Sequence, residues 1–268
     1  MKNQNFNLYT MAGSLFDKSV LQGVWANFLF ALIGTISIFI IFSIANKRKA
    51  YRIFGLDKKN RLSIFFSDTF VQNAIDKQGN PNLYTGSAVP ENEFKTIKEL
   101  FNLLSLIGEK DNAFIRFMKF LTFDPVKIEC ELSPTNEIEA EANKEVNILT
   151  IGGPGYNAMT SYFQKEKTRL FFGSNSQDHN VFVDRINNRT IAKGSFDYDY
   201  GILERIVDEN RVVILAYGFH INGTRGTVKY LVDNWKKLPK DFAYLIKFPH
   251  PSKDAIGYEK PLEVKNFI

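Results

Sequence analysis

Glycines cluster at one point in the middle of the chain, where a short β-prone run ends. Residues 146–151 are mostly apolar, Gly152-Gly153-Pro154-Gly155 follow directly, and a helix-compatible run begins at about Asn157. A strand, a glycine turn and a helix start form the local geometry of an anion site, because the backbone can approach a phosphate closely and helix N–H groups point at it. The first candidate ligand-binding residues are therefore Gly152, Gly153, Pro154, Gly155, Tyr156 and Asn157.

A second strand-to-helix junction of the same kind follows residues 211–217, the most β-prone run of the chain. Its loop begins at Gly218, and Thr224 is predicted to be the N-cap of a helix that continues to Lys237. An arginine at a helix N-terminus opposes the helix dipole, so Arg225 favours an anionic partner nearby. Carboxyl ends of strands in an open α/β sheet hold ligands, so both loops are expected to line one pocket. This loop contributes the candidates Gly218, His220, Gly223, Thr224 and Arg225.

Several site classes are excluded or disfavoured by the residues present. No Lys-Ser or Lys-Thr follows the glycines, so the first loop is not a P-loop, and the GxGxxG spacing of a dinucleotide site is absent. One cysteine and three scattered histidines make a Cys/His metal site and an intramolecular disulfide unexpected. Cys130 lies in an alternating run and is predicted to be a buried strand residue. A tight turn that needs glycines for its shape alone remains an alternative for the first loop.

An enzymatic alternative rests on two carboxylates. Glu91 and Glu93 follow Pro90 at the start of a predicted helix over residues 91–107. Either could stabilise an oxocarbenium-like transition state in the cleavage of a glycosidic bond. Acidic residues are also favourable in the first turn of any helix, which is the simpler interpretation of both.

An uncharged segment near the N-terminus indicates a membrane anchor. From Ser19 to Asn46 there is no charged residue, which exceeds the ~20 residues needed to cross a bilayer. Lys47, Arg48 and Lys49 follow at once, and the positive-inside rule then places the C-terminal bulk in the cytoplasm. The sequence predicts a tail over residues 1–19 outside, a span over 20–46 in the inner membrane, a basic linker over 47–60 and a cytoplasmic domain over 61–268. The net charge of +5 is attributed to this topology, so no nucleic-acid partner is expected.

Alternating strand and helix patterns predict one α/β domain. The expected fold is a Rossmann-like, mainly parallel sheet with helices on both faces and a β-hairpin insertion, preceded by one transmembrane helix. The acidic stretch 197–201 is expected to be a loop and the tail from Pro249 irregular. Strands are predicted over 61–67, 126–132, 146–151, 168–173, 180–186, 189–193, 202–207, 211–217 and 241–248, and helices over 91–107 and 113–121, from about 157, and over 224–237.

The order of these segments resembles that of known proteins. An apolar N-terminal helix, RLSIFFS, GSAVPxNE, IGGPGYNAMTSYF and VVILAYGFHINGTRGTVKYL together resemble a group of little-characterised bacterial proteins with a membrane anchor and a cytoplasmic Rossmann-like domain. The shorter GGPGYN, with a later GT-containing unit, is similar to a Rossmann-like domain of archaeal surface-layer proteins, which implies a structural role. Membrane-anchored α/β domains of prokaryotic antiphage signalling are similar in architecture.

The leading functional hypothesis is a membrane-anchored ligand sensor. It would bind a nucleotide-like or phosphorylated small molecule at the two glycine loops and transmit binding to its membrane helix by self-association as a homo-oligomer, in signalling or antiphage defence. No other cofactor and no metal are expected. The alternatives are a hydrolase of nucleotides or NAD that uses Glu91 or Glu93, and a membrane scaffold without a small ligand.

Overall fold

The structure is a computed structural model of the 268-residue chain. It describes residues 18–56, 61–67, 69–71, 86–88, 98–100, 127–132, 146–173, 181–195, 197–249 and 260–268. The chain divides into two compact units, Met1–Lys47 and Arg48–Ile268. Predicted residues Glu91 and Glu93, the predicted helix 113–121 and most of the predicted helix 91–107 lie outside the described residues.

The first described element is the long helix α2, Lys18–Phe54. It contains residues 20–46, so the predicted helical conformation of this segment is confirmed. Within the part of the chain that the structure describes, no helix is both long enough and apolar enough to cross a membrane. The predicted transmembrane span is therefore not confirmed.

The last turns of α2 belong to the folded unit, so residues 47–54 of the predicted linker are helical, and residues 57–60 lie outside the described residues. Ala50, Ile53 and Phe54 are fully buried in its core. The helix stops at Gly55, whose φ is 73°, and the N–H of Leu56 donates to the carbonyl of Tyr51 at 2.8 Å. This is the Schellman arrangement, which needs a left-handed residue such as glycine after the last helical turn.

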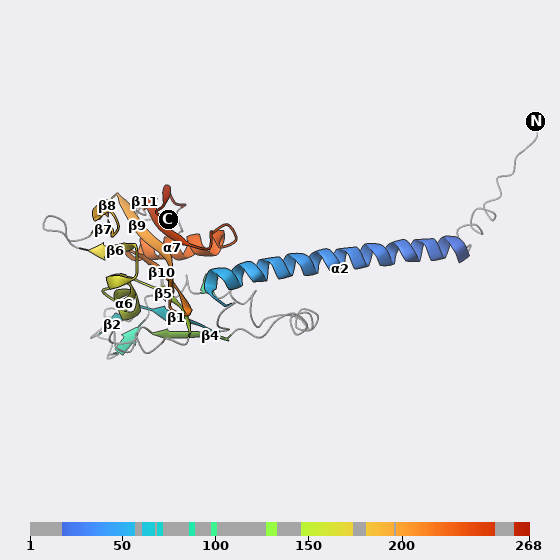
Figure 1. Ribbon diagram of the computed structural model, residues 1–268, viewed down its shortest axis with the longest axis horizontal. Coiled ribbons are helices and arrows are strands. Elements are labelled where there is room, and N and C mark those ends of the chain that lie inside the picture. Colours follow the sequence, from blue (N-terminus) through green and yellow to red (C-terminus); the bar gives the residue numbers. More distant parts are fainter. Residues whose placement is uncertain are drawn as a thin grey trace, which may run out of the picture. The chain divides into compact units, whose positions relative to one another are not determined.

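A seven-stranded sheet forms the centre of the unit Arg48–Ile268 (Figure 1). Four strands, in the order β4-β1-β5-β10, pair in parallel, and β10-β9-β11-β12 continue the sheet in antiparallel pairing. The sheet is therefore mixed. Parallel pairing is confirmed for one half of it, and the prediction that the sheet is mainly parallel is wrong. The strands are β1 Arg61–Phe66, β4 Lys127–Leu132, β5 Asn147–Ile151, β9 Tyr198–Asp208, β10 Arg211–Gly218, β11 Phe242–Pro249 and β12 Glu263–Asn266.

The antiparallel half differs from the prediction at two places. Strand β9 begins at Tyr198, so the acidic stretch 197–201 is mostly strand, because it pairs with residues 246–249 of β11. The tail predicted to be irregular supplies β12, which pairs with the other side of β11. Polar residues occupy both segments, and their backbone pairs with the apolar strand β11, although the four residues of β12 remain exposed.

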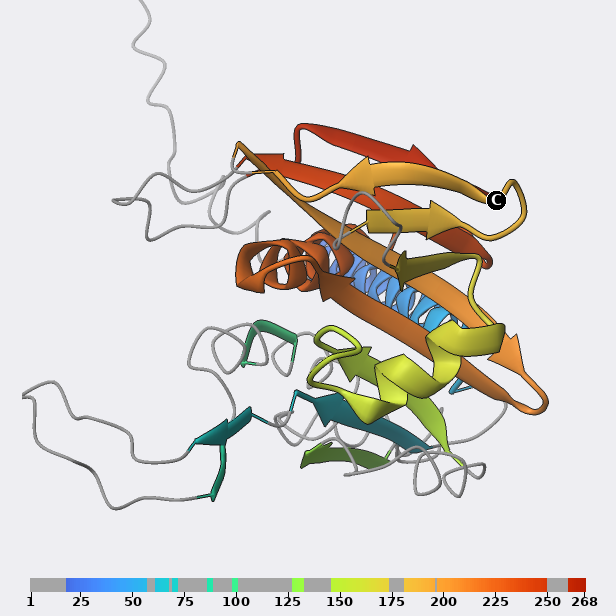
Figure 2. The same cartoon turned by 90° about the vertical axis from the view of Figure 1, so that its left-hand side faces the viewer.

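Both faces of the sheet are covered. On one face lie α6, Ala158–Glu166, and a three-stranded antiparallel sheet of β6, Leu170–Gly173, β7, Val181–Asp184, and β8, Arg189–Lys193. These elements face the viewer in Figure 2. The other face packs against α7, Ile221–Asn234, and the end of α2. The predicted hairpin insertion is confirmed, with β6 as a third strand.

An edge strand and a small separate sheet complete the described strands. Strand β4 is the last strand of the seven-stranded sheet, and Cys130 on it is exposed. The prediction that Cys130 is buried is therefore wrong, since a strand with one neighbour leaves part of its surface uncovered. Two short strands, β2 Thr69–Val71 and β3 Gly86–Ala88, pair separately.

Candidate functional site

The two predicted glycine loops lie at the same edge of the sheet. Strands β5 and β10 are parallel neighbours, with Ile151 opposite Ala216. The N–H of Gly152 donates to the carbonyl of Ala216 at 3.2 Å, and a Cβ on Gly153 would lie 3.7 Å from the carbonyl oxygen of Gly218. The structure thus brings together loops that are about 60 residues apart in the chain. They meet because parallel strands that pair directly have their carboxyl ends at the same edge of the sheet.

Within the first loop, Asn157 is a structural residue. It is the N-cap of α6, and its Oδ1 accepts the N–H of Thr160 at 3.1 Å. Its Nδ2 donates to the carbonyls of Phe65 and Ile151 at 3.2 and 2.9 Å. The side chain is buried with both polar ends bonded, which is how a buried amide is satisfied. Asn157 therefore joins β1, β5 and α6 and offers little to a ligand.

The accessible part of the first loop is the turn before Asn157. The N–H groups of Tyr156 and Asn157 both donate to the carbonyl of Gly153 at 3.0 Å, which closes the turn. Pro154 is half-buried, Gly155 is exposed, and 66% of Tyr156 is exposed. A Cβ on Gly155 would meet nothing within 4 Å. Open backbone and one exposed ring are what this loop presents to solvent.

In the second loop the predicted N-cap is wrong. Helix α7 begins at Ile221 with His220 as its N-cap, and Thr224 lies inside its first turns. The Thr224 hydroxyl accepts the N–H of Gly218 at 2.9 Å and is buried. Gly223 is also buried, Arg225 is half-buried, and the His220 side chain is 52% exposed. His220 and Arg225 are thus the chargeable residues of this loop that reach solvent.

Asp199 belongs to the acidic stretch that was predicted to be a loop, and the structure makes it part of the candidate site. It is fully buried on β9, and its carboxylate accepts the N–H groups of Gly223 at 2.6 Å and His220 at 3.3 Å. The Nδ1 of His220 lies 3.4 Å from the same carboxylate. A carboxylate at a helix N-terminus satisfies free N–H groups and the helix dipole, as a bound anion would. The N-terminus of α7 is therefore already occupied by the chain itself.

Two of the candidate glycines are required by close packing. A Cβ on Gly218 would overlap the backbone N of Thr224 and lie 2.5 Å from the carbonyl carbon of Gly223. A Cβ on Gly223 would overlap the carbonyl of Tyr200. These contacts hold the start of α7 against the ends of β9 and β10. Glycine at both positions is explained by the fold, in contrast to Gly155.

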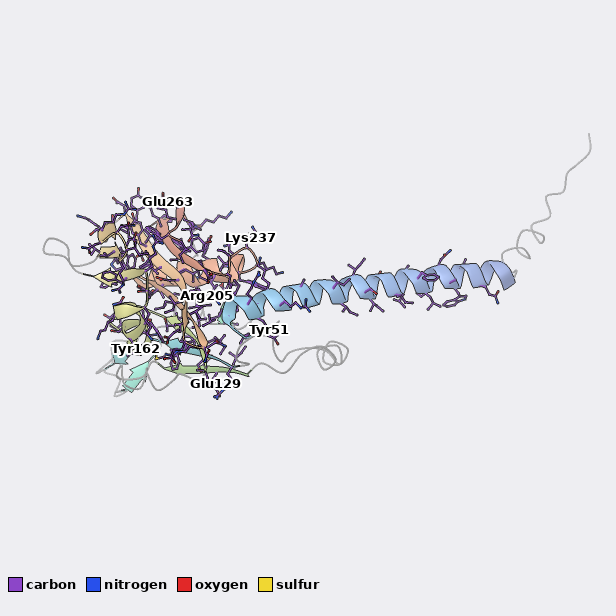
Figure 3. All side chains as sticks on the ribbon, viewed as in Figure 1. Tyr51, Glu129, Tyr162, Arg205, Lys237 and Glu263 are labelled. Atoms are coloured by element: carbon purple, nitrogen blue, oxygen red, sulfur yellow. The ribbon has the colours of Figure 1, made fainter. Side chains whose placement is uncertain are left out.

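The opposite ends of the same two strands hold the end of α2. Asn147, the first residue of β5, donates from Nδ2 to the carbonyl of Gly55 at 3.0 Å and accepts the N–H of Val212 at 2.9 Å. Arg205 on β9, labelled in Figure 3, is a second such residue. It donates to the carbonyls of Ile53 and Arg52 at 3.0 and 3.2 Å. Arg205 is buried, and it caps carbonyls that the helix leaves unpaired. Strands β5 and β10 thus connect the loop edge with the attachment of α2.

A buried carboxyl fastens the three-stranded sheet to β9. Glu204 is 2% exposed and accepts the backbone N–H groups of Arg169 and Leu170 at 2.6 and 3.0 Å. Burial raises the pKa of Glu204 to about 7, against the lowering effect of these two hydrogen bonds and of the Arg169 charge. The group therefore titrates near neutral pH.

Because this pKa is raised on folding, the free energy of unfolding is expected to fall as pH rises. The folded state holds a proton between pH 4.5 and about 7 that the unfolded state releases, so stability should decrease by about 3 kcal/mol across this window and level off above it. Urea unfolding of the full chain from pH 4.5 to 8 measures the slope. Glu204→Gln should remove it, whereas Glu263→Gln, at an exposed carboxylate on β12, should keep it. An unchanged slope in Glu204→Gln would contradict the assignment.

Comparison of the chain with known protein families, with curated proteins and with solved structures found no match. In the described part of the chain, no group of three or more His, Cys, Asp and Glu residues could hold a metal ion.

Proposed function

We propose that the protein binds a nucleotide-like or phosphorylated small molecule at the carboxyl edge of β5 and β10. The observation that carries this proposal is the meeting of the loops 152–157 and 218–225 at one edge of the sheet. Ligands of open α/β sheets bind outside the carboxyl ends of the strands. The ligand is assigned to this edge for that reason.

The charges at this edge decide how such a ligand would lie. The buried carboxylate of Asp199 at the start of α7 would repel a phosphate placed there. The phosphate therefore belongs beside Gly153 and Gly155 at the N-terminus of α6, where the helix dipole favours negative charge. The exposed ring of Tyr156 can stack on a base. Arg225 and His220 can contact further oxyanions from the other side.

Attachment to a lipid bilayer through α2 is the second part of the proposal. The segment between Ser19 and Asn46 has no charged residue, and its apolar side chains Val24, Trp25, Phe28, Ile33 and Ile41 are 57% or more exposed. Lipid would cover this surface, and the Lys-Arg-Lys run after it favours the cytoplasmic side of an inner membrane. Ligand binding would then reach α2 through β5 and β10 and act by self-association of the chain, in signalling or antiphage defence.

Titration of the full chain in liposomes against a nucleotide panel tests the proposal. ATP, GTP, NAD and cyclic dinucleotides form the panel, and binding of at least one is expected by calorimetry. Gly155→Ala should weaken that binding about tenfold, because a methyl group there points into the space left for the ligand. The free energy of unfolding should stay within about 0.5 kcal/mol, since the methyl group meets no protein atom within 4 Å.

Gly23→Ala on α2 is the matched control, because a Cβ there also meets nothing within 4 Å. It should bind the ligand as the unchanged chain does. Absence of binding to every member of the panel would overturn the ligand proposal. Failure of the full chain to float with liposomes would overturn the attachment to lipid.

A scaffold without a small ligand is the second candidate function. It is favoured by Asp199, which already neutralises the N-terminus of α7, and by the packing need for Gly218 and Gly223. Self-association of the chain in liposomes, without binding of any nucleotide of the panel, would favour the scaffold over the sensor. A hydrolase that uses Glu91 or Glu93 stays a prediction from the sequence.

A further inference from the structure

A cleft of about 500 Å³ opens between the three-stranded sheet and the C-terminal strand β12. It shares no residue with the glycine loops. The residues around it lie just before β6, between the end of β7 and the start of β8, and at the end of β12. They are Arg169, Asp184, Asn187, Arg189, Lys265, Asn266 and Phe267.

A buried carboxylate organises the wall of this cleft. Asp184 is fully buried, and its Oδ1 lies 3.4 Å from Nε of Arg169 and accepts the N–H of Ile186 at 3.2 Å. Its Oδ2 accepts a hydrogen bond from Asn187. Burial would raise the pKa of Asp184, but the hydrogen bond from Asn187 and the charge of Arg169 lower it. An ionised Asp184 therefore holds Arg169 and Asn187 in place.

The cleft carries an excess of positive charge. Arg169, Arg189 and Lys265 line it together with the single carboxylate of Asp184. Lys265 pairs with Glu263 at 3.0 Å, but both side chains are about half exposed, and such a surface pair is weak and exchanges readily. The guanidinium carbon of Arg169 lies 5.9 Å from the centre of the Phe267 ring, which limits its orientations. One arginine is thus fixed by its neighbours, while Arg189 and Lys265 are side chains at the exposed rim.

We propose that this cleft is a binding site for a small polyanion that carries a pyrophosphate-type group. Arginine forks bind the oxygens of phosphates in pairs, and a lysine adds a mobile point charge. Arg169 and Arg189 line the cleft from the side of the three-stranded sheet, and Lys265 lines it from β12. A ligand with two neighbouring phosphoryl groups could contact cations on both sides. The volume lies within the roughly 300–1,000 Å³ range of small-molecule sites. Free pyrophosphate and the diphosphate of a nucleotide share this chemistry.

Calorimetric titration of the full chain in detergent micelles with inorganic pyrophosphate, at about 50 mM salt, tests the site. The double variant Arg189→Gln with Lys265→Gln should weaken binding at least tenfold. Lys237→Gln with Lys240→Gln removes the same charge at exposed positions outside the cleft, and it should bind as the unchanged chain does. Equal loss in the two double variants would overturn the proposal, because it would show a response to net charge alone.

Further titrations distinguish free pyrophosphate from the diphosphate of a nucleotide, and binding in the cleft from binding at the glycine loops. ADP that binds as tightly as pyrophosphate indicates that the diphosphate group is recognised, and tighter binding of ADP indicates a nucleotide; both support the site. Binding of poly-glutamate without binding of pyrophosphate would overturn it in favour of an acidic peptide partner. Gly155→Ala should leave pyrophosphate binding unchanged, so failure of the glycine-loop proposal and failure of this one are separable.

Discussion

Replacement of Arg205 by alanine is expected to lower the free energy of unfolding by about 4 kcal/mol. The guanidinium donates to the carbonyls of Ile53 and Arg52 at 3.0 and 3.2 Å and to Asp241 at 3.1 Å. The bond to Ile53 is buried and the bond to Arg52 is partly buried, and a buried carbonyl that loses its donor keeps its desolvation cost of about 1–3 kcal/mol. The loss should therefore fall on the end of α2, where it joins the sheet.

Urea unfolding of the full chain in micelles measures this change. Lys240→Ala removes a cation from an exposed position and should alter stability by less than about 0.5 kcal/mol. Amide hydrogen exchange gives a local reading, and residues 50–56 should exchange faster in Arg205→Ala than in the control. A variant as stable as the control, with unchanged exchange at these residues, would show that Arg205 does not hold the helix.

Gly218→Ala is expected to destabilise the protein by about 4 kcal/mol, at or beyond the upper end of overpacking effects. The added methyl group would overlap the backbone N of Thr224 and lie within 2.6 Å of the Cα of Gly223. These atoms belong to helix α7, which cannot yield as a flexible side chain can. The start of the helix would have to move, and the bonds from Asp199 and Thr224 would be lost with it.

Thermal and urea unfolding measure this effect. Gly155→Ala is unfolded in the same way, as the matched substitution. The two glycines belong to the two loops of the same edge, so the pair separates packing from ligand access. Gly218→Ala should unfold much more easily, and Gly155→Ala should not. If Gly218→Ala folds normally and loses a nucleotide that the unchanged chain binds, Gly218 serves the ligand and the packing argument is wrong.

Local pattern predicted the strands whose own residues carry the signal. β1, β5 and β10 are apolar and β-branched runs that are buried along nearly their whole length, and such runs are strands in any compact α/β context. The hairpin of β7 and β8 was also predicted, because a polar turn separates two alternating segments. The start of β9 and all of β12 were missed, since their polar residues carry no such signal and β11 provides their pairing.

The same division holds for the candidate site. Glycine composition and the strand-to-helix order predicted two loops at strand ends and a helix start near Asn157, which are local properties; the role of Asn157 as N-cap comes from the structure. A shared carboxyl edge for the two loops was expected from the fold class, whereas the direct pairing of β5 with β10 is set by long-range contacts. Asp199 reaches α7 because Gly201 of β9 pairs with Gly218 of β10, 17 residues later.

The sequence by itself determined an α/β domain, an uncharged N-terminal helix and the two glycine loops, because each depends on residues that are close in the chain. Tertiary structure alone decided that the sheet is half antiparallel and that the start of α7 is closed by Asp199. It also decided that Arg205 caps α2 from 152 residues away and that Arg169, Arg189 and Lys265 line one cleft. Each of these depends on which strands become neighbours, and that is set by burial summed over the whole sheet, which no local pattern contains.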